Sequence, residues 1–390
     1  MTAVDIGQTL EVTAESLAFG GFAIARHEGL VLFVPFAAPG DRLLVEITEQ
    51  EKRHVRARIV EILEPSPHRR EVRCRHFQDC GGCQFQHVDY ATQLQAKADF
   101  VRDALVRIGG FEWPDPVTVH HSGEWGYRAR TQIKVHQREM GFHRAFSKEV
   151  VPVYECPVLA PELEAQIPEL REALTRAPRK PRIHQIEGAC GSDGPAWTPD
   201  LTDTRRELVE HRVQGFTYYV EPEGFFQGNR LLVDTLVGKA VEGLSGAHAF
   251  DLYAGVGLFT MPLSQRFDRV TAVEDERRAA TLGRVNAKIN GCTNVSYFRQ
   301  TTEQFLAQNK VTPDLVMMDP PRLGARPAIP ALLELGAEHL VYVSCDPNTL
   351  ARDLKTLVEG GYSVASVEAF DMFPQTYHVE CVAHLQRGKA

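Results

Sequence analysis

Short apolar runs alternate with amphipathic segments through the C-terminal part of the chain. From about Gly228 onward the apolar runs are AHAFDLY, RVTAVE, DLVMMD, HLVYVSC and YSVASVEAF. Strands and helices that alternate in this way form a parallel, doubly wound sheet with helices on both faces. We therefore predict an α/β, Rossmann-like domain over residues 226–390.

The N-terminal part has a different pattern. Residues 1–63 contain short runs of alternating apolar and polar residues, such as TLEVTAES and DRLLVEITEQ, separated by GG and APGD turn signals. This pattern predicts a small β-barrel. Pro65 and Pro67 mark a linker. Residues 64–225 mix strand-like runs with proline-rich loops and one expected helix at 161–174, and we predict a middle α+β domain there.

The composition is that of an ordinary globular protein, with 43% hydrophobic and 24% charged residues. No basic segment followed by an apolar run opens the chain, and no apolar stretch is long enough to span a membrane. We therefore expect a cytoplasmic protein with no membrane partner, and we expect it to be a monomer. In the cytoplasm its 8 cysteines stay reduced, so clustered cysteines suggest a metal site.

The net charge of −8 argues against a nucleic-acid partner, because proteins bind phosphates with Lys and Arg. The cations are nevertheless concentrated in two stretches, one between Glu51 and Arg75 and one between Arg128 and Lys148. Either stretch alone is as well explained by a solvated charged face. Folding that brings both stretches to one surface would make an RNA-binding face.

The segment AFDLYAGVGLFTMPL predicts a ligand site at the end of the first strand of the α/β domain. Asp251 ends the strand, and Gly255 and Gly257 form a tight turn that opens a helix. Glycine lets the backbone approach a ligand closely. The third glycine of a dinucleotide fingerprint would fall at position 260, which is Thr260, so a pyrophosphate ligand is disfavoured.

Two further carboxylates follow later strands. Glu274 ends the strand RVTAVE, where it can accept hydrogen bonds from a ribose diol, and Asp319 follows in MMDPPRLG. One such residue alone could be a helix cap. Three carboxylates at successive strand ends, with no phosphate-binding loop, favour adenosine that carries a cationic sulfonium.

Cys345 directly follows the apolar strand HLVYVS. An isolated cysteine after a strand is more often part of the core than a nucleophile. At this edge of the sheet it is suited to activating a uracil ring, because a thiolate that adds to carbon 6 makes carbon 5 electron-rich. A base must then remove the carbon 5 proton, and the segment DMFPQTYHVE supplies His378 and Glu380.

Three cysteines are clustered in CRHFQDCGGCQFQH, at Cys74, Cys80 and Cys83, and Cys156 could complete a set of four. Four thiolates suit either zinc or an iron–sulfur cluster, and the spacing leaves both open. The cluster lies between the two basic stretches, so folding around it would bring them together.

Five segments, FFQGN, DLYAGVGLF, DPPRLG, VYVSCDPNTLARD and DMFPQTYHVE, together resemble the RNA uridine-5 methyltransferase family. The resemblance implies a class I methyltransferase domain that methylates carbon 5 of a uridine in RNA with S-adenosylmethionine. It implies that Cys345 is the nucleophile and Glu380 the base, and that Arg322 shapes the pocket. The residues implied to contact S-adenosylmethionine are Gln227, Tyr253, Glu274 and Asp319, beside the turn at Gly255.

Two N-terminal segments extend the resemblance over nearly the whole chain. FGGFAIARHEGLVLFVPFAAPGDRLLVEI resembles the TRAM domain, an oligonucleotide-binding-type barrel, and implies RNA binding. CGGCQFQHVDYATQLQAK resembles the iron–sulfur region of the family's 23S ribosomal RNA members. This implies a [4Fe-4S] cluster of structural role, held by Cys74, Cys80, Cys83 and Cys156.

This sequence departs from the family pattern at three positions. Ala254 stands where the family usually has Cys, Leu258 where Asn is common, and Asp346 where the family has Asn after the nucleophile. Leu258 removes one polar contact to the cofactor, and Asp346 places a negative charge beside the thiol.

The expected substrate is ribosomal RNA. The T-loop uridine of transfer RNA is the nearest alternative, and a non-catalytic RNA-binding chaperone is the alternative from another class. An adenine N-methyltransferase is disfavoured. Such an enzyme needs an aromatic residue after DPP to stack the adenine base, and this chain has Arg322 there.

Overall fold

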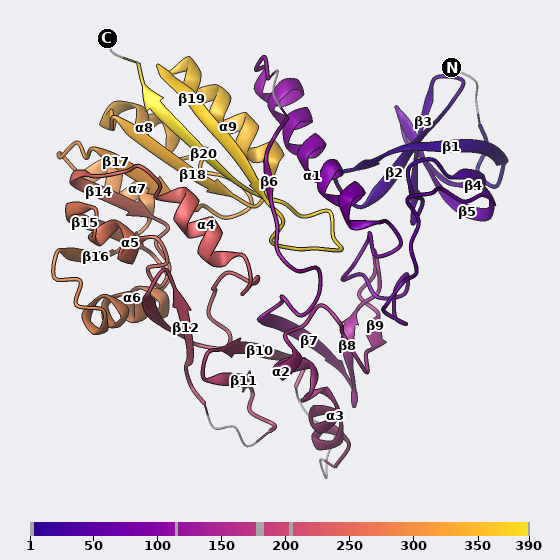
Figure 1. Cartoon of the computed structure of the whole chain (residues 1–390), viewed down its shortest axis with the longest axis horizontal. Helices are drawn as coiled ribbons and strands as arrows, with labels where there is room; N and C mark the ends of the chain where they lie inside the picture. The colour runs from indigo at the N-terminus through magenta and orange to yellow at the C-terminus, as the bar shows by residue number, and fades with distance from the viewer. Residues whose placement is uncertain (1–3, 114–115, 177–182, 203–205, 389–390) are drawn as a thin grey trace.

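A computed structural model describes residues 4–113, 116–176, 183–202 and 206–388. The N-terminal part is a closed five-stranded barrel of order β1-β2-β3-β5-β4, on the right in Figure 1. Its strands are Thr9–Ala18, Phe22–His27, Leu30–Pro35, Arg42–Gln50 and His54–Glu64. Alternate residues of β1 and β4 are buried, as the alternating sequence predicts.

A five-stranded sheet of order β11-β10-β7-β8-β9 lies below the barrel in Figure 1. Its strands are β7 Arg130–His136, β8 Glu139–His143, β9 Val150–Pro152, β10 Gln185–Gly191 and β11 Gly194–Thr198. The prediction of a single helix at 161–174 is wrong in one detail, the number of helices. Two helices occupy this segment, α2 at Pro161–Glu164 and α3 at Ile167–Arg176. The hairpin of β12, Val209–Val213, and β13, Phe216–Val220, follows.

The C-terminal part is built on an eight-stranded sheet of order β16-β15-β14-β17-β18-β20-β19-β6. Strands β14 to β18 are parallel, and β20 runs antiparallel to β18. The strands are β14 Gly246–Leu252, β15 Phe267–Glu274, β16 Val295–Arg299, β17 Leu315–Met318, β18 His339–Ser344, β19 Tyr362–Phe370, β20 Glu380–Arg387 and β6 Val119–His120. The predicted α/β sheet is therefore confirmed.

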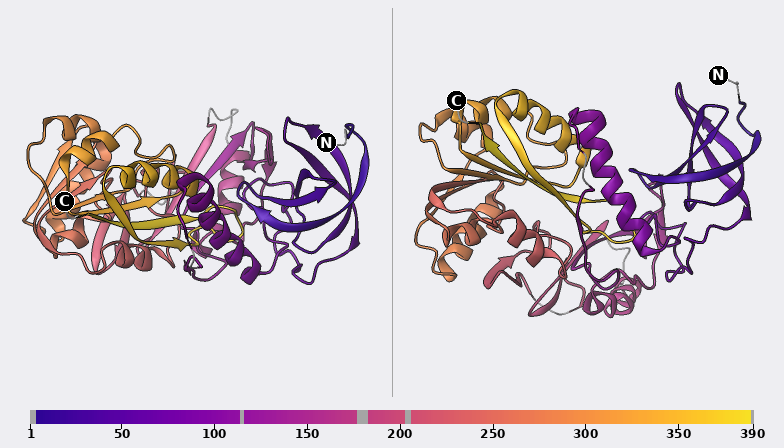
Figure 2. Two further views of the ribbon diagram at one scale, coloured as in Figure 1. Left: turned by 90° about the horizontal axis from the view of Figure 1, so that it is seen from above. Right: turned by 45° about the horizontal axis from the view of Figure 1, so that its top comes forward.

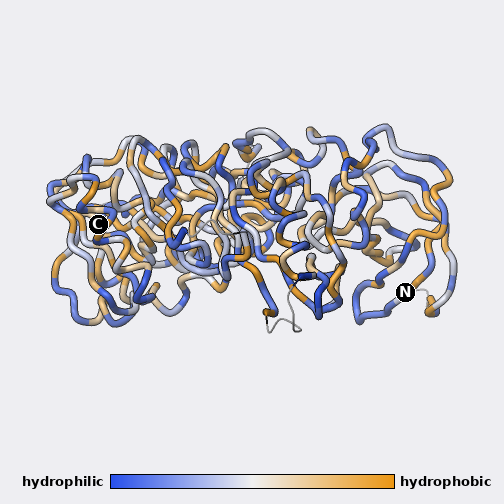
Figure 3. Tube along the Cα trace, turned by 90° about the horizontal axis from the view of Figure 1, so that it is seen from below, coloured by the Kyte–Doolittle hydropathy of each residue, from blue (hydrophilic) through white to orange (hydrophobic). Residues whose placement is uncertain are grey.

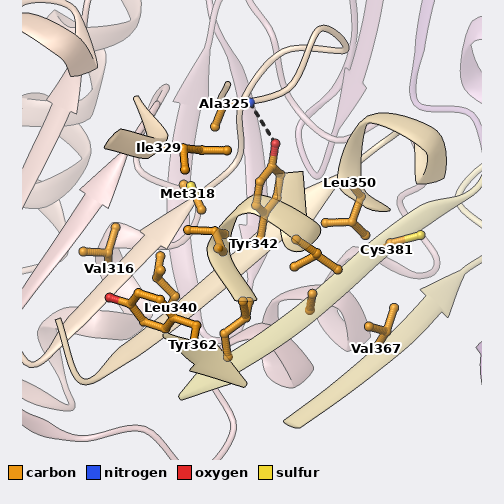
Figure 4. Packing of buried hydrophobic residues seen from close by; sticks show 14 of the residues in the cluster. Val316, Met318, Ala325, Ile329, Leu340, Tyr342, Leu350, Tyr362, Val367 and Cys381 are labelled. Carbon is orange, nitrogen blue, oxygen red and sulfur yellow. Dashed lines mark hydrogen bonds between the residues drawn. The ribbon is translucent and has the colours of Figure 1, made fainter. Parts of the chain in front are cut away.

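Helices cover the sheet. They are α4 Val233–Ala240, α5 Thr260–Ser264, α6 Arg277–Ile289, α7 Thr302–Gln308, α8 Ile329–Leu335 and α9 Pro347–Glu359. Beneath them, β14, β17 and β18 are buried almost throughout, which explains their continuous apolar sequences. Figure 4 shows this core, in which the Tyr342 hydroxyl accepts a 2.9 Å hydrogen bond from the Ala325 N–H.

The helix α1, Tyr90–Ala104, joins this core although it precedes the first parallel strand, β14, by more than a hundred residues. It continues as a π-helical turn over Leu105–Gly109. Val101 and Leu105 pack in the same buried cluster as Leu350 and Leu354 of α9. Figure 2 shows α1 lying between the barrel and the C-terminal sheet. The division of the chain at 1–63, 64–225 and 226–390 stays a prediction.

Hydrophobic and hydrophilic segments are interspersed along the chain in Figure 3. Among the helices in the described ranges, none has the length and apolar character needed to cross a membrane.

Candidate active site

Three carboxylates lie at the carboxyl ends of adjacent strands. The sheet order β15-β14-β17 makes these strands neighbours. Asp251 lies near the end of β14, Glu274 ends β15, and Asp319 directly follows β17. The negative charges of Asp319 and Glu274 both act on Asp251. The structure thus brings together the three carboxylates that the sequence predicted around a cofactor.

The turn after β14 leaves open space beside its backbone. Tyr253, Gly255 and Gly257 have φ angles of 61°, 55° and 99°, in the left-handed region. A Cβ added to Gly257 would lie 2.4 Å from the Met261 Cε atom, so a side chain is excluded there. A Cβ added to Gly255 would meet nothing within 4 Å. A ligand can therefore approach the main chain closely at Gly255.

Asp251 is 1% exposed, and only one of its two carboxylate oxygens has a partner in the described part of the chain. Oδ2 accepts a hydrogen bond from the Thr260 hydroxyl, whereas Oδ1 is buried without one. Burial raises the pKa of Asp251 to about 7, and the charges of Asp319 and Glu274 add to the rise. A cation bound here would stabilise the ionised carboxylate, which fits a sulfonium.

The Glu274 carboxylate is held against the glycine turn by the backbone. Oε2 accepts a 2.8 Å hydrogen bond from the Gly255 N–H, and Oε1 accepts a 2.8 Å bond from the Glu276 N–H. A carboxylate oxygen has two lone pairs, so each oxygen can accept one more hydrogen bond. The arrangement suits a ligand diol.

Gln227 is 4% exposed and lines a cavity of about 190 Å³ with Cys190, His211 and Arg230. This cavity lies between the β7–β11 sheet and the segment that leads into α4. The contact of Gln227 with a cofactor stays a prediction.

Cys345 and Glu380 flank one antiparallel pair of residues. Ser344, at the end of β18, pairs with Cys381 of β20. Cys345 follows Ser344, and Glu380 precedes Cys381. The thiol and the carboxylate therefore stand at the same sheet edge, one strand from Asp319.

This edge gathers three acidic groups around one guanidinium. Burial raises the pKa of Cys345 to about 11, and the charges of Glu380 and Asp319 raise it further, whereas Arg322 opposes the rise. Burial also raises the pKa of Glu380 well above its usual range, and that of Asp319 to about 7. Because these groups disfavour one another's negative charge, they titrate as a set.

His378 is the second base that the sequence offered, and its environment does not favour that role. The Arg322 Nη2 atom lies 3.4 Å from its Nδ1 atom. Burial lowers the pKa of His378 to about 4, and the charges of Arg322, Lys97 and Arg128 contribute. An imidazole with so low a pKa holds an abstracted proton weakly, which makes His378 a weak base.

The segment 371–379, between β19 and β20, carries His378 and leads directly into Glu380. The buried Lys97 of α1 forms an ion pair with Asp371, and the Tyr90 hydroxyl donates a 2.8 Å hydrogen bond to the same carboxylate. Lys97 also donates to the Phe373 carbonyl at 3.0 Å. Helix α1 thus fixes the start of this segment.

Gln375 fixes its middle. The residue is fully buried and has a φ of 70°. Its carbonyl accepts hydrogen bonds from the N–H groups of Gln84 and Phe85 at 2.9 and 3.0 Å. Its side-chain oxygen accepts bonds from Arg70 and Gln93, at 2.8 and 3.0 Å. Sequence reasoning missed Gln375, because nothing in DMFPQTYHVE separates it from an ordinary loop residue.

The three departures from the family pattern have structural explanations. The Asp346 carboxylate caps α9, where Oδ1 accepts from the Asn348 and Thr349 N–H groups at 2.8 and 3.3 Å. Its charge is therefore matched by the helix N-terminus. Ala254 and Leu258 are each 7% exposed and fill packed positions behind the glycine turn.

The four clustered cysteines line one cavity, together with Arg128. Burial raises the pKa of each of these thiols, to about 12 for Cys83. Within the described ranges, no group of three or more His, Cys, Asp or Glu side chains is arranged to hold a metal ion. The structure thus brings Cys74, Cys80, Cys83 and Cys156 together without the geometry of a single-ion site.

A doubly wound sheet with acidic residues at the ends of β14, β15 and β17 defines the protein as a class I methyltransferase. The family model "tRNA (Uracil-5-)-methyltransferase" matches residues 202–388, and the TRAM domain model matches residues 3–60. The 23S rRNA (uracil(1939)-C(5))-methyltransferase RlmD of Klebsiella pneumoniae (strain 342) is 34% identical, over 97% of this chain and 96% of that protein. Its counterpart in Photorhabdus laumondii is 33% identical over the same shares.

The chain belongs to the RNA uracil-5 methyltransferase family, as these relatives establish. Among solved structures, the Pyrococcus abyssi tRNA (uracil-54, C5)-methyltransferase in complex with S-adenosyl-L-homocysteine superposes with a TM-score of 0.77. That structure is 26% identical and covers 96% of this chain and 100% of its own. The predicted family, the predicted fold and the predicted S-adenosylmethionine-dependent enzyme class are confirmed.

Proposed function

We propose that this chain methylates carbon 5 of a uridine in 23S ribosomal RNA through a covalent bond between Cys345 and carbon 6. The observation that carries the mechanism is the pairing of β18 with β20, which sets Cys345 beside Glu380 at the cofactor edge of the sheet. The ribosomal substrate rests on relatives of that activity that align with nearly the whole chain.

The Cys345 sulfur bonds to carbon 6, and the electron pair displaced from the ring double bond makes carbon 5 nucleophilic. S-adenosylmethionine supplies the methyl group: carbon 5 bonds to the methyl carbon, the bond from that carbon to the sulfonium sulfur breaks, and S-adenosylhomocysteine leaves. Glu380 then removes the carbon 5 proton, the ring double bond re-forms, and the carbon–sulfur bond breaks to release the thiolate. Arg322 favours the thiolate at the start and again at the end, because its charge opposes the rise in the Cys345 pKa.

We propose that S-adenosylmethionine lies against the open backbone at Gly255. Tyr253, Glu274 and Asp319 would surround it, and Gln227 would contact it. The buried Asp251 oxygen that lacks a partner supports a cationic ligand at this place.

We also propose that Cys74, Cys80, Cys83 and Cys156 hold a [4Fe-4S] cluster. The four thiols line one cavity, which supports a shared ligand. Four thiolates are the ligand set of a four-iron cluster and of structural zinc alike, so the metal content of the purified protein decides between them. The role of the cluster would be structural.

Transfer RNA is the second candidate substrate, because the similar Pyrococcus abyssi structure is that of an enzyme named for uracil 54 of transfer RNA. The substrates are distinguished by mapping 5-methyluridine in ribosomal and transfer RNA from cells that lack this gene. Loss of the modification from 23S ribosomal RNA supports our proposal, and loss from transfer RNA alone contradicts it.

The chemistry is tested by variants of the catalytic pair. Cys345→Ala is expected to abolish methyl transfer from labelled S-adenosylmethionine. Glu380→Gln is expected to transfer one methyl group and then stall as an RNA–protein adduct that survives denaturing electrophoresis. Cys292→Ala, a cysteine outside this edge, is the matched control and should behave as wild type. Turnover by Glu380→Gln near the wild-type rate without an adduct would assign the base to His378 or water. Binding of RNA with no transfer by the wild-type protein would support a chaperone instead.

A further inference from the structure

The barrel and the β8–β9 hairpin meet at a pair of stacked aromatic rings. Phe22 is the first residue of β2, and Phe146 lies in the turn between β8 and β9. Their ring centroids are 5.4 Å apart, and their planes differ by 19°. The Arg56 guanidinium, from β5, lies 5.6 Å from the Phe22 centroid and 5.9 Å from that of Phe146. We name these three residues the aromatic platform.

Phe146 is 76% exposed, although it is a large apolar side chain held in a defined position. Its φ of 57° lies in the left-handed region, which is strained for a non-glycine residue. The ring therefore does not serve the hydrophobic core, and most of it is exposed to solvent. Large exposed aromatic residues in strained turns are commonly ligand contacts.

The platform is fixed from both sides. On the barrel, Phe33 packs edge-on against Phe22 at 6.0 Å and against His54 at 5.0 Å. On the hairpin, the Gly81 N–H donates a 2.9 Å hydrogen bond to the His143 carbonyl. The Arg144 side chain forms ion pairs with Asp79 and Glu149. A rigid platform loses little conformational entropy when a ligand stacks on it.

The surrounding charge favours a polyanion. Lys52 and Arg53 are exposed in the turn between β4 and β5, and Lys148 is exposed two residues beyond Phe146. Carboxylates balance part of this charge: Glu49 lies 3.2 Å from Arg56, and Glu51 and Glu149 are exposed in the same two turns. The platform is also where the two basic stretches meet, because Arg56 belongs to the first and Lys148 to the second.

We propose that the aromatic platform stacks an unpaired base of the substrate RNA. Aromatic side chains bind single-stranded RNA by stacking on its bases, with arginine contributing over the ring faces. A base in a duplex is already stacked on both sides, so only an unpaired one can use the exposed face of Phe146. The assignment rests on the proposed function for the identity of the ligand as RNA.

The test is the dissociation constant of the full-length protein for a short single-stranded RNA, measured by fluorescence anisotropy without S-adenosylmethionine. Phe146→Ala is expected to weaken binding roughly 5- to 100-fold, the usual effect of losing one stacked base. Phe146→Trp should bind at least as tightly as wild type. Phe146→Leu should bind as weakly as the alanine variant, because it keeps apolar area but has no aromatic face. Ile6→Ala, which alters another exposed apolar residue of the barrel, is the control and should have no effect.

The proposal is overturned if Phe146→Ala binds with the wild-type dissociation constant. It is also overturned if Phe146→Leu binds as wild type, which would indicate an apolar protein contact. Equal weakening for the same strand annealed to its complement would contradict stacking of an unpaired base. Methyl transfer is measured separately, so failure of the catalytic proposal would leave these binding results unaffected.

Discussion

The main-chain carbonyl of Gln375 accepts a 2.9 Å hydrogen bond from the backbone N–H of Gln84. Gln84 directly follows Cys83, and Gln375 stands five residues before Glu380. This bond therefore joins the cysteine-bearing segment to the segment that leads into Glu380, the base in our proposal.

Gln375→Ala should impair the step that needs Glu380. The substitution removes the hydrogen bonds that the Gln375 side chain accepts from Arg70 and Gln93, which costs about 1–3 kcal/mol. We expect a lower melting temperature, a lower kcat with an unchanged KM for S-adenosylmethionine, and accumulation of the RNA–protein adduct. Gln95→Ala on the exposed face of α1 is the control. A melting temperature that falls without any adduct would show a purely structural role.

Binding of S-adenosylmethionine should depend on pH more than binding of S-adenosylhomocysteine. The pKa values of Asp251 and Asp319 are raised to about 7 by burial, so both ionise as pH rises through 7. A cation binds the ionised form better, whereas the neutral thioether gains nothing from it. Calorimetry at pH 6 and pH 8 should show the affinity ratio of the two ligands rising severalfold. Asp251→Asn should flatten this dependence, and an equal pH dependence for both ligands would contradict the role of these carboxylates.

Arg322→Gln should make the Cys345 thiol less reactive. The pKa of this thiol is about 11 even with Arg322 beside it, because burial dominates. Removing the guanidinium raises the pKa further, and the thiolate fraction at pH 8 then falls. Peptide-level mass spectrometry after alkylation by iodoacetamide should show slower labelling of Cys345. Arg326→Gln, another exposed arginine of the same loop, is the control, and slowing by it to the same extent would refute a specific role for Arg322.

Protein purified without oxygen should be brown and contain iron and acid-labile sulfide if the four cysteines hold a cluster. Cys80→Ser should lose the colour and much of the solubility, since one ligand to the buried group is lost. Cys292→Ser should keep both properties. Stoichiometric zinc without iron in the wild-type protein would disprove the cluster.

The strands and the catalytic edge could be predicted because each depends on local sequence. The buried strands β14, β17 and β18 are short, mainly apolar runs, and each has an Asp or Cys within or directly after its carboxyl end. Parallel strands place such residues at one edge, so the proximity of Asp251, Asp319 and Cys345 follows from the pattern.

The contacts that support this edge could not be predicted in the same way. Gln375 bonds to Gln93, and Lys97 pairs with Asp371, across more than 270 residues of sequence. Neither periodicity nor turn chemistry encodes such a pairing. A lysine within an amphipathic helix is usually solvated, and only the tertiary structure shows that Lys97 is fully buried.

The position of α1 has a consequence for the synthesis of the chain. Its apolar residues Val101 and Leu105 are buried against α9, which leaves the ribosome far later. Until α9 is made, this apolar face of α1 has no packing partner and stays exposed on the nascent chain. A fragment that begins at residue 202 would lack α1 altogether and expose the apolar residues of α9 that α1 covers. The core of the methyltransferase part is therefore complete only when both α1 and α9 have been synthesised.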